Sequence, residues 1–149
     1  NYGAKNTERV KATYKLLLAV CLAYSVLMWS LVMMLPSLFV SIFTPEAELI
    51  TFASRALRIY FSGMALFGIQ IASQMTFVSL GNAPSSVLVA VVRKFVLLLP
   101  LIYIMPSIVS DATTGVYIAE PIADLLAVTF TAILFYFQFK KALRKIEVK

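Results

Sequence analysis

Long apolar runs dominate the hydropathy pattern of this chain, and the charged residues gather in short clusters between them. Four runs stand out, at residues 16–43, 59–80, 87–108 and 116–139. About 20 consecutive apolar residues are enough for a helix to cross the hydrocarbon core of a bilayer. The pattern therefore predicts an all-α integral membrane protein with four transmembrane helices.

Breaks in these runs predict where the helices bend. Pro36 predicts a kink near the end of the first run, because proline cannot donate the helical backbone hydrogen bond. Residues 46–60 are amphipathic and indicate a short interfacial stretch that continues straight into the second span. Residues 81–86 predict a compact turn, and Pro100 and Pro106 predict bends in the second half of the third span.

Composition supports a membrane protein. Apolar residues make up 61% of the chain and charged residues 13%, and the mean hydropathy is +0.91. A soluble domain has roughly 25% charged residues, so this chain lacks the polar residues for a water-facing surface. With no histidine and Cys21 as its single cysteine, the chain offers no Cys/His metal site and no internal disulfide.

The net charge of +6 is distributed as a topology signal. Basic residues cluster at 5–15, at 93–94 and at 140–149, next to the ends of apolar runs, and not over one face as nucleic-acid binding requires. Four spans place these three clusters on one side of the membrane. We therefore expect both termini to be cytoplasmic and no nucleic acid to be a partner.

One face of the second span is polar and aromatic. Gln70 and Gln74 are one helical turn apart, and Phe67 and Phe77 continue the same face. Glutamines are costly against lipid, so this face is expected to point into the bundle or a cavity. Two interpretations stand: hydrogen bonds to neighbouring helices, or a wall that binds a drug-like substrate.

Asp124 is an ionisable residue about two turns inside the fourth span, where a charge is costly in free energy. Glu120 lies one turn earlier on the same face. The carboxylates are candidates for proton or ion coupling, and the alternative is a structural ion pair. Arg93 and Lys94, inside the third span, either extend to the headgroups or pair with a carboxylate in the bundle.

No enzyme site is recognisable. The chain has no histidine base, no glycine-rich phosphate loop and no nucleophile elbow, so we expect neither an enzyme nor a bound cofactor.

An ordered set of short motifs resembles the multidrug and toxic compound extrusion (MATE) family. The motifs are NYGAKN at 1–6, ALRIY at 56–60, LGNA at 80–83, Arg93 with LPL at 99–101, GVY at 115–117 and EPIAD at 120–124. The resemblance implies a twelve-helix, two-lobe carrier, of which residues 1–149 form the C-terminal part of the second six-helix lobe. The opening without Met agrees with a segment from a longer protein, so the N-terminal part of the same carrier is an expected partner.

The resemblance also implies a function. Such carriers lie in the plasma membrane of bacteria or archaea and export lipophilic cationic drugs in exchange for H⁺ or Na⁺ by alternating access. Gln70, Gln74, Phe67 and Phe77 would then be substrate-binding residues, and Asp124 a coupling or structural carboxylate. The alternatives are a lipid-linked oligosaccharide flippase of the same superfamily and a membrane module that assembles partners without transport.

Overall fold

The computed structural model describes residues 1–147, and all regular elements within them are helices. The helices are α1 (Thr7–Met34), α2 (Pro36–Ser41), α3 (Ala47–Tyr60), η1 (Met64–Leu66), α4 (Phe67–Ser79), α5 (Ala83–Val91), η2 (Val92–Leu98), α6 (Leu99–Ile108) and α7 (Ala112–Glu147). The prediction of an all-α protein is confirmed.

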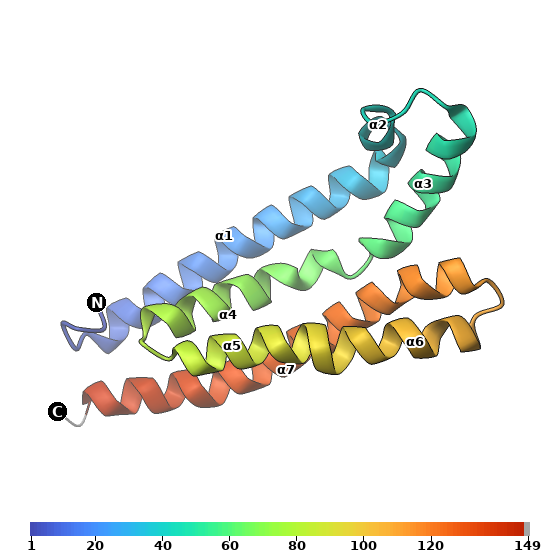
Figure 1. The fold of residues 1–149 in the computed structure, drawn as a ribbon. Coiled ribbons are helices and arrows are strands. Elements are labelled where there is room, and N and C mark those ends of the chain that lie inside the picture. Colours follow the sequence, from blue (N-terminus) through green and yellow to red (C-terminus); the bar gives the residue numbers. More distant parts are fainter. Residues whose placement is uncertain (148–149) are drawn as a thin grey trace.

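Three of the helical stretches have the length and apolar character of membrane spans. They are α1, the continuous stretch Ala83–Ile108 that joins α5, η2 and α6, and Ala112–Ile146 of α7. The pair formed by α3 and α4 is a fourth span if its two bent halves are counted together. The N-terminus and the end of α7 lie at the same end of the bundle (Figure 1), as an even number of spans requires.

Helix α4 lies between α1 and α7 and contacts both, and the third span runs along α7 (Figure 1). The buried apolar core is small and aromatic, with Phe77 from α4, Val89 from α5 and Phe135 from α7 at its centre. Many large apolar side chains elsewhere are exposed, such as Phe43 at 88%. This outer surface suits a protein whose surroundings are lipid or further helices rather than water.

The breaks in the first and second spans have recognisable causes. The proline at position 36 ends the first long helix and starts α2, so the predicted kink is a full break at Leu35. The prediction that residues 46–60 continue straight into the second span is wrong, because α3 and α4 are bent by 49°. Ser62 and Gly63 lie at the bend, and Gly/Ser pairs are common kink sites because neither favours the helix interior.

The loop between the second and third spans is shorter than residues 81–86. Gly81 has φ +74°, a left-handed conformation that glycine adopts without steric cost, and it reverses the chain. Helix α5 already begins at Ala83, because Pro84 fits the first helical turn, where no backbone donor is needed.

The third span contains a wide helical turn that the sequence did not predict. Residues Val92–Leu98 form a π-helix directly before Pro100, and the helix continues through Pro100 and Pro106 to Ile108. The N–H of Leu99 donates to the carbonyl of Lys94, one residue further back than in an α-helix. A wider turn at this place accommodates the proline ring and the carbonyl that it cannot bond.

Asp111 caps α7. Its carboxylate accepts hydrogen bonds from the Thr114 hydroxyl and from the Thr114 backbone N–H, the latter at 3.0 Å. The hydroxyl bond, followed by the backbone bond, lowers the pKa of Asp111 below its ordinary value. A lowered pKa means that this cap stabilises α7 above the pKa of the unfolded chain and is lost as pH falls through the folded-state pKa.

We therefore expect the first turn of α7 to lose amide protection as the pH falls below about 4. Hydrogen exchange at residues 112–115, corrected for the intrinsic exchange rate, measures this. In Asp111→Asn the protection of the same amides should not depend on pH over this range. An equal pH dependence in that variant would show that another group titrates.

Candidate functional site

The charged residues predicted in the third and fourth spans meet in one buried cluster. The Nη2 atom of Arg93 lies 2.6 Å from Oδ1 of Asp124, and the Nε–H of Arg93 donates to the same oxygen at 2.7 Å. The same Nη2 donates to Oε1 of Glu120 at 3.0 Å. Arg93 thus bridges two carboxylates that lie one turn apart on α7.

Burial differs within the cluster. The Asp124 and Glu120 side chains are 5% and 8% exposed, and that of Arg93 is 16% exposed. Lys94 is 49% exposed, and its Nζ lies 3.4 Å from Oε1 of Glu120. The two carboxylates therefore depend on Arg93 for a buried counter-charge, and Lys94 contributes from the rim.

Three elements place these side chains together. Positions 120 and 124 share one face of α7 because an α-helix repeats every 3.6 residues. Arg93 and Lys94 belong to the π-helix η2, whose widened turn lies against α7. The bend after α3 completes the site: a Cβ atom at Gly63 would lie 3.0 Å from Cα of Pro121 and 3.2 Å from Cβ of Asp124.

An aromatic ring covers the guanidinium. The Cζ atom of Arg93 lies 4.7 Å from the centre of the Phe67 ring. A cation over an aromatic face gains roughly 0.5–2 kcal/mol, most when water is excluded. Phe67 therefore fixes the arginine from α4, while α7 fixes it from the other side.

The cluster satisfies the electrostatic demands of a membrane interior. An isolated carboxylate at the centre of a membrane helix costs at least ~2.5–3.5 kcal/mol, so it needs a partner or must bind a proton or ion. Of the two interpretations that the sequence leaves for Arg93, the structure has the pairing with a carboxylate. Glu120 is a buried member of the same cluster.

The four residues predicted to line a substrate wall have different surroundings. Gln74 donates from Nε2 to the backbone carbonyl of Ser86 on α5 at 3.2 Å, which is helix packing. Phe77 is 1% exposed, with its ring centre 5.3 Å from that of Phe135. Gln70 is buried, and its Oε1 has no hydrogen-bond partner among residues 1–147. Phe67 alone joins the charged cluster, and the substrate wall stays a prediction.

Sequence reasoning missed two features of the interior. One is the contact between Phe67 and Arg93, which nothing in the sequence around either residue indicated. The other is the stack of Tyr14 on Phe135, with ring centres 4.4 Å apart. The spacing of Phe135 and Phe139 by one turn was the available signal for an aromatic face on α7.

Comparison with known proteins agrees with this architecture. The family model MatE matches residues 1–104. The fold is similar to the crystal structure of the Vibrio cholerae MATE transporter VcmN in the bent form, with a TM-score of 0.80 and 17% sequence identity. The match covers 99% of this chain and 32% of that one, so this chain spans about a third of its length. No curated protein matches the chain.

The matched residues include α1 to α5, the whole of η2 and the first half of α6, and so contain Arg93 and Phe67. The structural match also covers α7, the helix that carries Glu120 and Asp124. This chain is a multi-pass membrane protein that belongs to the MatE family.

Proposed function

We propose that this chain is part of a carrier that exports lipophilic organic cations in exchange for H⁺ or Na⁺. Membership of the MatE family supports a carrier, and the solved relative bears the name of a MATE transporter. The observation that carries the proposal is the buried pair Glu120 and Asp124, which among residues 1–147 share the single buried counter-charge of Arg93.

The cluster offers a physical basis for exchange. Two buried carboxylates must be neutralised in every state of the carrier, by Arg93, by a proton or Na⁺, or by a cationic substrate. If Arg93 moves away in one state, Asp124 gains affinity for a small cation in that state only. Such differential affinity is what an ion needs to shift an equilibrium between two conformations.

The π-helix supplies a candidate moving part. Wide turns of this kind have weaker backbone hydrogen bonding than an α-helix, and they occur often at functional sites. Conversion of Val92–Leu98 to α-helix would rotate Arg93 about the helix axis relative to α7. The ion pair would then be exchangeable without separation of whole helices.

Efflux by the full-length protein in vesicles tests the proposal. We expect export of ethidium or norfloxacin to be driven by an imposed H⁺ or Na⁺ gradient, and Asp124→Asn to reduce the gradient-driven rate by at least about tenfold. Asp111→Asn is the matched control, since Asp111 is exposed and outside the spans, and it should transport normally.

Cation export and the coupling role of Asp124 can be contradicted separately. Absence of efflux of any organic cation by the wild-type protein would overturn the proposal of cation export. Unchanged gradient-driven efflux in Asp124→Asn would remove that residue from coupling and leave it a structural role. Size-exclusion chromatography of each variant separates loss of transport from loss of folding.

A further inference from the structure

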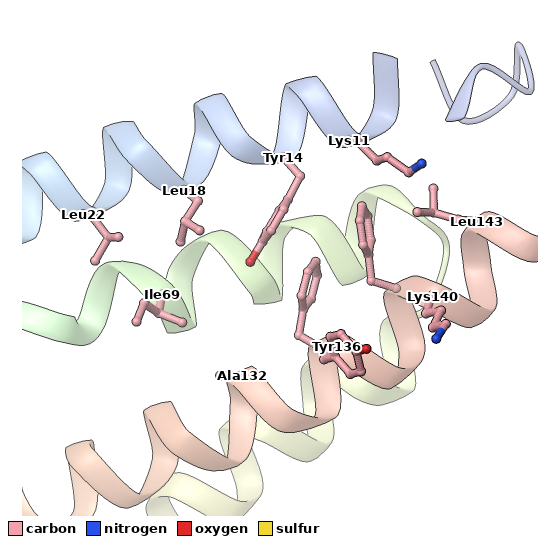
Figure 2. A pocket seen from close by; sticks show the side chains of 11 residues that line it. Lys11, Tyr14, Leu18, Leu22, Ile69, Ala132, Tyr136, Lys140 and Leu143 are labelled. Carbon is pink, nitrogen blue, oxygen red and sulfur yellow. The ribbon is translucent and has the colours of Figure 1, made fainter. Parts of the chain in front are cut away.

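A second feature, distant from the charged cluster, is an apolar groove of about 550 Å³ between α1, α4 and α7. Figure 2 shows Leu18 and Leu22 of α1 directed toward Ile69 of α4, with Ala132 of α7 on the opposite side. At the end of the groove nearest the chain termini lie two lysines, Lys11 and Lys140 (Figure 2).

From these features we infer that the groove binds one anionic phospholipid, with its phosphate between the two lysines and an acyl chain against the leucines. The inference requires only a membrane protein and is independent of which substrate the carrier moves.

The length of the groove fits an acyl chain. Lys11 and Leu22 are separated along α1 by about 16 Å, at ~1.5 Å per residue. Half of the ~30 Å hydrocarbon core of a bilayer is ~15 Å, the depth of one leaflet. The groove thus begins at a charged rim and continues as apolar surface over the depth that one leaflet provides.

The floor of the groove is aromatic. Tyr14 and Phe135 are stacked, and the Phe139 ring centre lies 5.2 Å from that of Tyr14 and 4.9 Å from that of Phe135. Packed rings present a broad apolar surface. An acyl chain that enters the groove beside the lysines would lie against these rings.

The charges at the rim are available to a phosphate. Lys140 is exposed and lies over the Tyr136 ring, 5.9 Å from its centre. Lys11 donates to Glu8 at 3.1 Å, but this pair is exposed, with side chains 41% and 83% accessible, and such pairs are worth little. A phosphate can replace the Glu8 carboxylate at small cost.

Further basic residues surround this end of the bundle. They are Lys5, Arg9, Lys15, Lys141, Arg144 and Lys145, all exposed. Basic residues beside a membrane surface attract anionic lipids, with a gain of about 1 kcal/mol, or roughly fivefold in affinity, for each one close to the lipid phosphate, and the gain falls off with distance. The same charge disfavours a cationic drug, so the groove is unsuited to the substrate class proposed for the carrier.

The test uses the full-length protein reconstituted with phosphatidylcholine and a trace of phosphatidylglycerol that carries a photoreactive group on its acyl chain. We expect crosslinks to peptides of α1, α4 and α7 that contain Leu18, Ile69 and Ala132. Labelled phosphatidylcholine should give at most about a fifth of the yield.

Variants assign the site. Lys11→Gln with Lys140→Gln should reduce the yield at these peptides about 25-fold, the product of two fivefold losses. Lys15→Gln with Arg144→Gln removes the same net charge outside the groove and should leave most of the yield. Ala132→Phe fills the groove without changing its charge and should abolish acyl-chain crosslinks while the protein remains folded.

The inference is overturned if the two lipids label the groove equally, or if both charge pairs reduce labelling to the same extent. It is also overturned if the groove peptides crosslink only to another part of the polypeptide or to a second copy, because the groove would then be covered by protein.

Discussion

Arg93→Met is expected to lower the free energy of unfolding of the full-length protein by about 3–5 kcal/mol, because it leaves two buried carboxylates without their shared cation. The loss falls mainly on Asp124, which is 5% exposed, accepts a hydrogen bond from Nε of the arginine and lies 2.6 Å from its Nη2. Denaturant unfolding in detergent, followed by intrinsic fluorescence, measures the change, and a lower melting temperature should accompany it.

The adjacent lysine is the matched control. Lys94→Met removes the same charge one residue away, but Lys94 is half exposed and 3.4 Å from Glu120. Exposed pairs contribute about 0–1 kcal/mol, so this variant should remain close to the wild type. Equal effects of the two substitutions would show that the ion pairs of Arg93 do not hold the spans together.

A rescue variant separates the ion pair from the volume of the arginine. Arg93→Met combined with Asp124→Leu and Glu120→Gln removes all three buried charges, and apolar replacement of buried ion pairs is often neutral or stabilising. We expect stability to return toward that of the wild type, while transport stays lost. A triple variant as unstable as Arg93→Met would assign the defect to packing around Phe67.

The sequence predicts the parts of this fold that depend on local chemistry. Apolar runs of membrane length define the helices, Pro36 ends the first, and Gly81 reverses the chain. The bend at Ser62 and Gly63 was not predicted, since the amphipathic pattern of residues 46–60 continues to the break without interruption. Its cause is tertiary as well as local, because the bend fits against Pro121 of α7.

The site was predictable only as a set of separate residues. The cost of a charge in a membrane identifies Asp124 and Arg93 individually. Their pairing also requires that η2 lie against α7, which is a tertiary contact between distant parts of the chain. The sequence does not say which helices are neighbours, so both interpretations of Arg93 stay open until the packing is known.

Gly68→Ala is expected to lower the free energy of unfolding by about 1–3 kcal/mol, although it adds one methyl group. A Cβ atom at Gly68 would lie 2.5 Å from the carbonyl oxygen of Cys21, 2.6 Å from its carbonyl carbon and 2.8 Å from the backbone nitrogen of Leu22. All three are backbone atoms of α1, so no change of rotamer relieves the contact. Gly3→Ala, with nothing within 4 Å of its Cβ, is the control and should be neutral.

The close approach of the α1 and α4 backbones at Gly68 distinguishes the defect of Gly68→Ala from ordinary overpacking of side chains. Helices in a membrane associate through small residues that let backbones come close, since apolar burial alone gives no gain over lipid. The methyl group must therefore move α1 away from α4 as a unit, and this movement should also loosen the stack of Tyr14 of α1 on Phe135 of α7. Addition of Cys21→Ala should not restore stability, because the clash is with the Cys21 backbone. Recovery in that double variant would show that the side chain, and not the backbone, limits the distance between the two helices.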